Sequence, residues 1–183
     1  MFVRGLKTAA ACFLLGVFCF TLLPWLWAYS RLDHWVREPY FSCPVPVPSE
    51  GIKIRSDRYG KGHFGASRGN KGQRRHLGID LLAPVGRPVF ASQSGRVYLA
   101  GFDKGYGNYV ELAHPEGFST RYAHLSEVLV KTGDWVPQGM LLGRSGKTGN
   151  ANSKLIKAHL HFEIRYARIP LDPRQWMGGL APQ

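Results

Sequence analysis

The sequence predicts a mainly β domain that follows one long apolar segment. From position 51 onward, glycine recurs every few residues between short apolar runs such as 88–91 and 107–112. Short apolar runs bounded by turn residues are typical of strands joined by tight turns. Residues 157–165 alternate apolar and polar side chains, which is the period of a strand with two different faces.

The composition fits one globular domain with appendages. The chain has 183 residues, of which 44% are hydrophobic and 13% aromatic, and this argues against a disordered protein. Three cysteines exclude a disulfide scaffold, and the absence of a C-x-x-C pair gives no sign of a thiolate metal site. A single long apolar run excludes a multi-span membrane protein, and neither a collagen-like nor a coiled-coil pattern occurs.

The charge balance favours an anionic partner. Lysine and arginine number 24 against 12 acidic residues, which gives a net charge of +12. Nucleic acid, anionic lipid and an anionic wall polymer all match such a charge. Nucleic acid is not expected, because the most basic stretch holds only Tyr59 and Phe64 as aromatic side chains for stacking. That stretch either meets an anionic envelope polymer or forms a solvated basic face, and its cations are Lys53, Arg55, Arg58, Lys61, Arg68, Lys71, Arg74 and Arg75.

The N-terminal segment, residues 1–30, is predicted to be a membrane anchor. Residues 8–30 carry no charge, and as a helix they would span roughly 34 Å, enough to cross a bilayer core. Arg4 and Lys7 precede the run, which favours a cytoplasmic amino end and an exported remainder. The alternative is a signal peptide cleaved after Ala28, but the residues before it match the small-residue pattern poorly. We therefore expect an uncleaved transmembrane helix that holds the rest of the chain outside the cytoplasm, in the periplasm or extracellular space.

Three segments follow the anchor. Residues 31–50 are predicted to form a tether, because proline alternates with valine over 44–48 and stiffens the chain. Residues 51–172 hold the predicted domain, and residues 173–183 read as a loosely held tail.

Two histidines share the polar face of the strand predicted over 157–165. His159 and His161 are two residues apart, so their imidazoles point the same way, about 7 Å apart along the strand. Such a pair can share a metal, or one imidazole can bind the metal while the other moves protons. A surface pair with no role is the alternative interpretation.

A histidine and an aspartate form a second motif. His76 and Asp80 are four residues apart, and Gly78 with the apolar residues after Asp80 predicts a turn running into a strand. Two histidines and a carboxylate are a common catalytic zinc set, which leaves one coordination position for water. An incidental histidine beside a capping aspartate is the alternative. His124, in Tyr-Ala-His-Leu, is a third candidate, whereas His63 and His114 lack metal spacing and are expected in turns or on the surface.

The order of these motifs resembles that of the lysostaphin-type (LytM) zinc metalloendopeptidases, which cut peptide bridges in bacterial peptidoglycan. H-x-x-x-D, Y-A-H-L and H-L-H-F-E follow one another, with matching glycine and proline positions between them, over roughly residues 51–172. The resemblance implies a small antiparallel β-sheet with an open groove and one zinc ion at its floor. Helical H-E-x-x-H is absent, which excludes thermolysin-like zinc peptidases.

The resemblance also implies a role for each candidate residue. The family's metal ligands fall on His76, Asp80 and His161, and its two non-ligand catalytic histidines fall on His124 and His159. His159 would act as general base, and His124 would stabilise the oxyanion or help the leaving amine, although the division of these roles stays open.

The expected function is zinc-dependent hydrolysis of peptide cross-links or stem peptides of peptidoglycan. The alternative is a non-catalytic peptidoglycan-binding protein that activates another cell-wall hydrolase, because some members of the family have lost their ligands. The expected partners are peptidoglycan and, through the N-terminal helix, the membrane, while an envelope activator protein is left open.

Overall fold

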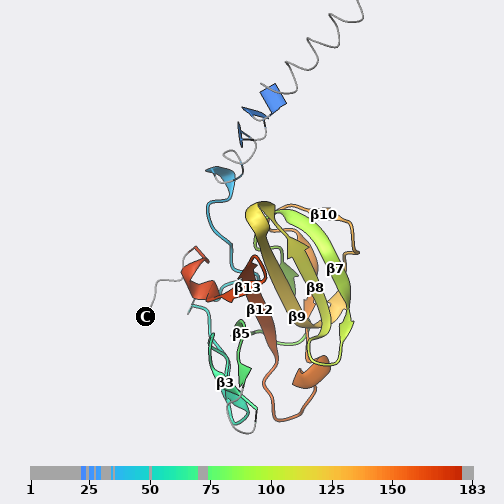
Figure 1. Ribbon diagram of the computed structural model, residues 1–183. Coiled ribbons are helices and arrows are strands. Elements are labelled where there is room, and N and C mark those ends of the chain that lie inside the picture. The colour runs from blue at the N-terminus through green and yellow to red at the C-terminus, as the bar shows by residue number, and fades with distance from the viewer. Residues whose placement is uncertain are drawn as a thin grey trace, which may run out of the picture. The chain divides into compact units, whose positions relative to one another are not determined.

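Residues 22–23, 25–26, 28–29, 34, 36–49, 51–69 and 74–178 are described by a computed structural model (Figure 1). The chain divides into two units, Met1–Pro39 and Tyr40–Gln183. In the first unit, most described residues are helical. No helix in the described part of the chain has both the length and the apolarity that a membrane crossing needs. The anchor predicted over residues 8–30 falls mostly outside the described residues.

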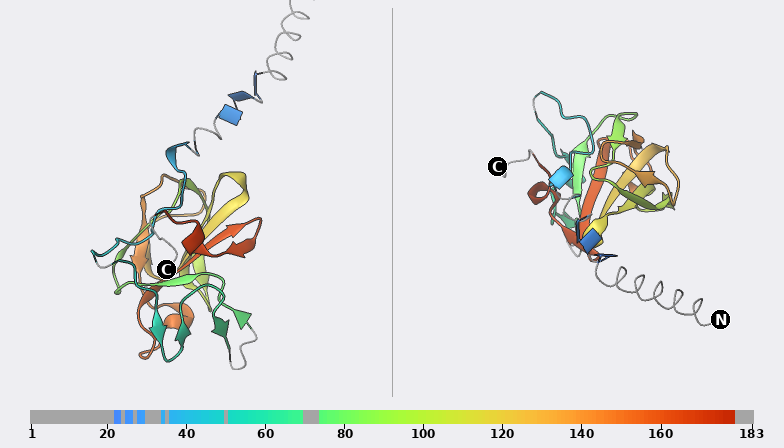
Figure 2. Two further views of the ribbon diagram at one scale, coloured as in Figure 1. Left: turned by 90° about the vertical axis from the view of Figure 1, so that its left-hand side faces the viewer. Right: turned by 90° about the horizontal axis from the view of Figure 1, so that it is seen from above.

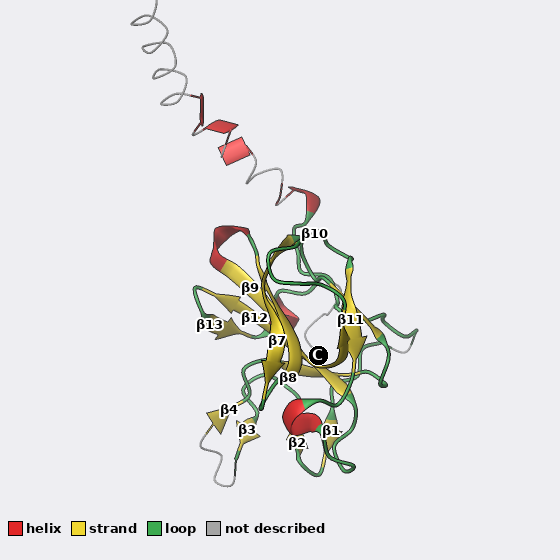
Figure 3. Cartoon of the chain, turned by 90° about the vertical axis from the view of Figure 1, so that its right-hand side faces the viewer, coloured by secondary structure: helices red, strands yellow, loops and turns green. Residues whose placement is uncertain are grey.

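The second unit consists almost entirely of strands joined by loops, which confirms the mainly β prediction (Figure 3). Its strands are β1 (Ser56–Asp57), β2 (Gly60–Lys61), β3 (Ser67–Arg68), β4 (Arg74–Arg75), β5 (Ile79–Leu82), β6 (Pro88–Phe90), β7 (Gly95–Asp103), β8 (Gly107–Ala113), β9 (Phe118–Val128), β10 (Trp135–Val136), β11 (Leu141–Ser145), β12 (His159–Tyr166) and β13 (Ile169–Leu171). Three single 3-10 turns accompany them: η1 (Pro115–Gly117), η2 (Gly149–Ala151) and η3 (Pro173–Gln175).

The main sheet is organised around β9. Its strand order is β10-β7-β8-β9-β11-β6, and β12 pairs with β9, β5 and β13. All of these pairs are antiparallel. One edge of β9 pairs with β8, whereas the other edge pairs first with β12, up to Ala123, and then with β11, from Leu125. His124 therefore lies where β9 changes partner.

The strand predicted over 157–165 is β12, which lies beside β9 and carries two different faces (Figure 1). Its apolar face joins the core, where Phe162 packs against Tyr122 of β9 with ring centroids 5.3 Å apart. Its polar face is buried as well, because His159 and His161 are only 3% and 6% exposed. The two histidines thus line the floor of a recess instead of an open surface.

Residues 54–62, which precede the main sheet in the sequence, form backbone hydrogen bonds with the edge of β5 that faces away from β12. Ile54 forms a bridge with Leu81, the amide of Arg55 donates to the carbonyl of Asp80, and the amide of Asp80 donates to the carbonyl of Gly62. Farther along, β3 and β4 form a hairpin that leads directly into the His76 motif (Figure 2). Residues 53–69 are therefore fastened to the strand that carries Asp80.

The second unit begins at Tyr40, ahead of the boundary predicted at Gly51. Phe41 and Val45, inside the predicted tether, are 1% and 4% exposed, and they belong to the core. The predicted tail also contributes, because η3 and the buried Met177 return to Phe41 through a parallel bridge. Burial of these apolar side chains stabilises the packing of both ends of the unit against the sheet.

Both ends of this unit meet at the far end of β12. Phe118 packs against Phe41, Tyr166 and Trp176, with ring centroids 5.7, 5.0 and 5.1 Å away. Tyr166 is the last residue of β12 and His159 is the first. Seven residue steps separate them, roughly 23 Å along an extended strand.

Candidate metal centre and catalytic groove

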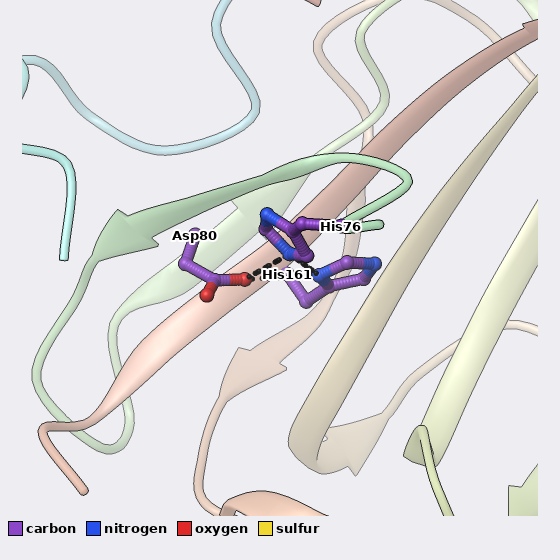
Figure 4. A group of neighbouring side chains, drawn as sticks. All are labelled: His76, Asp80 and His161. Carbon is purple, nitrogen blue, oxygen red and sulfur yellow. Dashed lines mark hydrogen bonds and ion pairs between the residues drawn. The ribbon is translucent and has the colours of Figure 1, made fainter. Parts of the chain in front are cut away.

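Three side chains converge on one point, as the sequence predicts for His76, Asp80 and His161 (Figure 4). The Nε2 atom of His76 lies 3.0 Å from Oδ1 of Asp80 and 3.0 Å from Nδ1 of His161. Nδ1 of His161 lies 2.9 Å from the same oxygen of Asp80. All three side chains are buried.

Strand register explains how residues so far apart in sequence meet. β5 and β12 are antiparallel neighbours, and His161 lies directly opposite Asp80. The turn predicted at Gly78 brings His76 over the same point. A Cβ atom at Gly78 would lie 2.2 Å from the carbonyl oxygen of Phe162, so only glycine permits this close approach to β12.

The proton positions on the two imidazoles leave lone pairs at the convergence point. Nδ1 of His76 donates to the carbonyl of His63 at 2.9 Å, because a carbonyl only accepts. Nε2 of His161 donates to Oε1 of Glu163, also at 2.9 Å. The remaining ring nitrogens and Oδ1 of Asp80 therefore face one another as three electron donors, an arrangement that needs a cation among them.

The donor set fits zinc. Two imidazole nitrogens and one carboxylate oxygen are ligands that Zn²⁺ binds at about 2.0–2.1 Å, and tetrahedral bonds of that length separate ligand atoms by about 3.3 Å. The observed separations of 2.9–3.0 Å are slightly shorter, so a small opening of the triangle would admit the ion. Three protein ligands leave the fourth position open toward the groove.

The second oxygen of Asp80 is held by two arginines that the metal motifs did not reveal. Arg55 donates to Oδ2 through Nε at 3.1 Å and through Nη2 at 3.0 Å, and Arg68 donates to it at 3.0 Å. The third nitrogen of Arg55 contacts both oxygens of Asp57 at 2.8 Å. Asp57 also accepts from the amide of Lys157, just before β12. We name Arg55 and Arg68 the arginine clamp of Asp80.

Charge coupling in the cluster is strong. Burial would raise the pKa of Asp80, but hydrogen bonds from His161 and His76 hold it well below its usual range. Burial would lower the pKa of His161, yet its bonds to Asp80 and Glu163 raise it to about 9. Asp80 is therefore ionised at neutral pH. Without a metal, His161 is protonated on both ring nitrogens and lies as a cation between the carboxylates of Asp80 and Glu163.

His159 lies beside the ligands with one ring nitrogen free. Its Nδ1 donates to the carbonyl of Lys157 at 2.7 Å, and its Nε2 lies 3.8 Å from Oδ1 of Asp80. Burial lowers the pKa of His159 from its ordinary value. The neutral ring thus carries a lone pair on Nε2, close to Asp80, and can accept a proton there.

His124 faces His159 across the recess, with ring centroids 5.0 Å apart. Its Nδ1 donates to the carbonyl of Thr148 at 3.0 Å, so its Nε2 is also free. Burial, followed by the neighbouring His161 and His159, lowers the pKa of His124 to about 3. All five side chains that the sequence predicts for the site therefore meet in one recess.

The backbone at His124 is irregular because β9 changes its pairing partner there. Its φ is 63°, in the left-handed region, and the register between β8 and β9 shifts beside it. Such β-bulges redirect a side chain at the end of a pairing. Here the bulge turns the imidazole into the recess at the residue where β9 leaves β12.

Glu163 is a functional residue that the sequence analysis missed. It is completely buried and holds His161 through Oε1, which also accepts from the hydroxyl of Tyr106 at 2.9 Å. Its other oxygen lies 2.7 Å from Arg165 and 3.5 Å from Arg121. Burial would raise the pKa of Glu163, but His161 and the arginines lower it to about 2. The signal in the sequence was its place on the same strand face as His159 and His161.

The convergence point opens into a groove of about 410 Å³. Its lining includes the five site residues, the clamp, and residues from β4, from the loop before β8, and from η2 and the segment after it. They are Arg55, Arg68, Arg74, Arg75, His76, Leu77, Asp80, Asp103, Gly105, Tyr106, His124, Asn150, Ala151, Ile156, His159, His161 and Glu163. An open groove is what the resemblance to LytM peptidases implied.

The two other histidines of this unit lie outside the recess. His63 contributes only its carbonyl, to His76. His114, expected in a turn or on the surface, lies at the start of the turn η1, but it is buried there. It is 7% exposed, and both ring nitrogens are bonded, to the carbonyl of Ser94 and to Thr120. Its burial follows from packing against Phe41 at a centroid distance of 5.5 Å.

Comparison with known proteins places this site in a family. The sequence profile of Peptidase family M23 matches residues 74–173. Peptidoglycan DD-endopeptidase ShyC of Vibrio cholerae is 39% identical over 101 residues, which cover 55% of this chain and 22% of ShyC. The chain thus spans about a fifth of the length of that relative.

Solved structures agree with this match. A zinc-containing peptidase from Vibrio cholerae has a TM-score of 0.62 at 28% identity, over 80% of this chain and 41% of that one. The catalytic domain of lysostaphin from Staphylococcus simulans has a TM-score of 0.56 at 32% identity, over 68% and 90%. A chain of the SpoIIIAH–SpoIIQ complex has a TM-score of 0.59 at 31% identity, over 75% and 99%.

Proposed function

This chain belongs to peptidase family M23, and on that premise we propose that it is a zinc-dependent endopeptidase that hydrolyses peptide cross-links or stem peptides of bacterial peptidoglycan. One observation carries the proposal: His76, Asp80 and His161 aim three lone-pair atoms at one point, 2.9–3.0 Å apart, at the floor of a groove. The DD-endopeptidase activity named for ShyC and the zinc content named for the Vibrio cholerae structure support it.

His76, Asp80 and His161 would hold the zinc ion. The ion would supply Lewis acidity and lower the pKa of a water molecule toward neutrality. The arginine clamp would keep Oδ2 of Asp80 occupied, so that Oδ1 is directed to the metal. Glu163 would fix the orientation of His161 in the same way.

His159 and His124 would carry out the proton and charge chemistry. The free Nε2 of His159 is the group that would accept a proton from the attacking water. The free Nε2 of His124 would first take up a proton released from the water through His159, which it faces, and as an imidazolium it would then stabilise the oxyanion or pass that proton to the leaving amine. Both imidazoles start neutral at pH 7, since burial lowers both pKa values.

We also propose that residues 8–30 form a membrane helix and that the catalytic unit works in the cell envelope, outside the cytoplasm. The uncharged run and the cations before it support this location. Peptidoglycan lies in the same compartment.

A second candidate function is a binding protein without hydrolytic activity. The similarity to a chain of the SpoIIIAH–SpoIIQ complex favours it, because that protein is named for an assembly with a partner. The complete set of five side chains favours the enzyme instead. Bound metal and turnover separate the two functions.

The experiment uses the full chain purified in detergent. Zinc content is measured, and peptidoglycan sacculi are incubated with the protein with and without a chelator. Soluble fragments are identified by mass spectrometry. His161→Ala should lose zinc and activity together, whereas His159→Ala should lose activity and keep most of the zinc. His34→Ala, a histidine outside the catalytic unit, is the control and should match the wild type.

Three outcomes would contradict the proposal. Fragment release that persists in chelator would exclude the metal mechanism. Wild-type turnover in both His161→Ala and His159→Ala would exclude the assigned site. Stable binding of a partner protein by a zinc-free chain without turnover would favour the second candidate.

A further inference from the structure

The four arginines that line the groove divide into two pairs with different surroundings. Arg55 and Arg68 are committed to Asp80 as the clamp. Arg74 and Arg75 form β4, and both side chains are exposed. The basic stretch of the sequence is therefore not uniform, since one pair is bonded to the site and the other pair faces the groove.

Arg74 and Arg75 have no acidic partner among the described residues. Arg75 donates one nitrogen to the carbonyl of Gly65 at 3.3 Å, which leaves most of its five N–H donors available. The side chain of Arg74 forms no hydrogen bond or ion pair with any residue in the described part of the chain. Each of the two guanidinium groups lines the groove without an acidic partner in the described part of the chain, so each is available to bind an anionic ligand.

The carboxylates that line the groove are already bonded elsewhere. Asp80 is held by the clamp, and Glu163 is held by His161 and Arg165. Asp103 accepts the amides of Gly105 and Tyr106 with Oδ1. None of these three carboxylates forms an ion pair with Arg74 or Arg75.

The position of the pair relative to the metal centre is fixed by the sequence. Arg75 directly precedes His76, and neighbouring Cα atoms are about 3.8 Å apart. The hairpin partner strand, β3, carries Arg68 of the clamp, so β4 is tied to the same centre. An anion held by Arg74 or Arg75 would thus lie in the groove that also contains the proposed metal centre.

We propose that Arg74 and Arg75 form a subsite for a carboxylate of the substrate peptide. The inference rests on the proposed peptidase function and narrows its substrate class. The substrate is a peptide with a free carboxylate on a residue next to, or one removed from, the scissile amide. Acidic stem peptides meet this requirement, whereas uncharged glycine bridges do not.

The test measures binding, so that it is independent of hydrolysis. Two synthetic cross-linked peptides are compared. In one the carboxylates flanking the scissile amide are free, and in the other they are amidated. Their Kd values are measured by calorimetry with the full chain in chelator, which prevents cleavage. We expect the wild type to bind the free-carboxylate peptide about tenfold more tightly, the contribution of one charge-assisted hydrogen-bonded pair.

Matched variants identify the residues responsible. The double variant Arg74→Gln/Arg75→Gln should lose the preference and bind both peptides alike. Arg58→Gln removes an exposed arginine of the same stretch that does not line the groove, and it should keep the preference. Circular dichroism of each variant checks that the fold is retained.

The outcomes separate this inference from the proposed function. Equal affinity of the wild type for both peptides, or a preference that survives in the double variant, would overturn the subsite. An equal loss in Arg58→Gln would also overturn it, because the effect would then come from the overall charge. A preference that depends on Arg74 and Arg75 in a chain that fails to digest sacculi would support the subsite while the hydrolytic function fails.

Discussion

Arg55 donates two hydrogen bonds to the same carboxylate oxygen of Asp80, from Nε at 3.1 Å and from Nη2 at 3.0 Å. The other oxygen of Asp80 is the one that faces His76 and His161. Both partners are almost fully buried, so the contact is shielded from water. Arg55, together with Arg68, therefore occupies Oδ2 and leaves Oδ1 as the oxygen that would bind the proposed metal.

Arg55→Lys tests this relationship without changing charge. Lysine keeps the cation but cannot reproduce the planar fork, so Asp80 loses its fixed orientation. We expect the zinc Kd, measured by competition with a chromogenic chelator, to rise about tenfold. Arg58→Lys, an exposed arginine outside the groove, should leave the affinity unchanged. Unchanged affinity in Arg55→Lys would show that Asp80 is oriented by other contacts.

Glu163→Gln tests the support of His161. Glutamine has the same shape but lacks the charge that holds the proton on Nε2 of His161 and balances Arg165. We expect zinc affinity to fall about tenfold and the free energy of unfolding, from urea titration, to fall by about 2 kcal/mol. Glu127→Gln breaks an exposed ion pair with Arg144 and should change neither quantity measurably. Equal effects of the two substitutions would contradict a special role for Glu163.

His124→Asn tests the second catalytic imidazole. Asparagine tolerates the φ of 63° at this position better than alanine does, so the bulge should be retained. We expect kcat on sacculi or cross-linked peptide to fall about 100-fold while zinc content stays at the wild-type level. Loss of zinc in this variant would instead make His124 part of the metal site.

The stability of the chelator-treated protein should depend on pH through His124. Burial, with the nearby His161 and His159, lowers its pKa to about 3 from its ordinary value of 6.5. Between these values the unfolded chain binds the additional proton, so stability is full above pH 6.5 and falls as pH drops. From pH 6.5 to 5 the wild type should lose about 1.5 kcal/mol more than His124→Asn in urea unfolding. Parallel losses in the two proteins would show that His124 titrates normally.

Phe41→Ala tests whether the start of the unit is structural. Phe41 is 1% exposed and contacts both His114 and Phe118. Its truncation should lower the free energy of unfolding by about 3 kcal/mol. Val47→Ala, at a side chain 55% exposed in the same segment, should cost less than about 0.5 kcal/mol. A small loss in Phe41→Ala would favour the predicted tether.

The sequence predicted the parts of the site that depend on local pattern. The alternation over 157–165 placed His159 and His161 on one face, and Gly78 indicated a turn instead of a helix between His76 and Asp80. Both features follow from the geometry of a few adjacent residues, so they can be read without knowing which strands become neighbours. The convergence of the motifs came from resemblance to a family.

The parts that the sequence did not predict depend on packing between distant segments. Arg55 and Arg68 were seen only as members of a basic stretch, because their contact with Asp80 requires residues 53–69 to lie along β5. Glu163 was seen only as a polar position, because its contacts with Tyr106 and with Arg121 of β9 join segments that are distant in the sequence. Phe41 was assigned to the tether, because nearby prolines gave a stronger local signal than one aromatic side chain.

The two ends of β12 lie in different parts of the unit. Tyr166 closes the strand beside the aromatic cluster where the catalytic unit starts at Tyr40, and His159 opens it at the groove. A segment joined ahead of Tyr40 is therefore attached near the end of β12 that lies away from His159. Immobilising the protein by its amino end should thus leave the groove accessible.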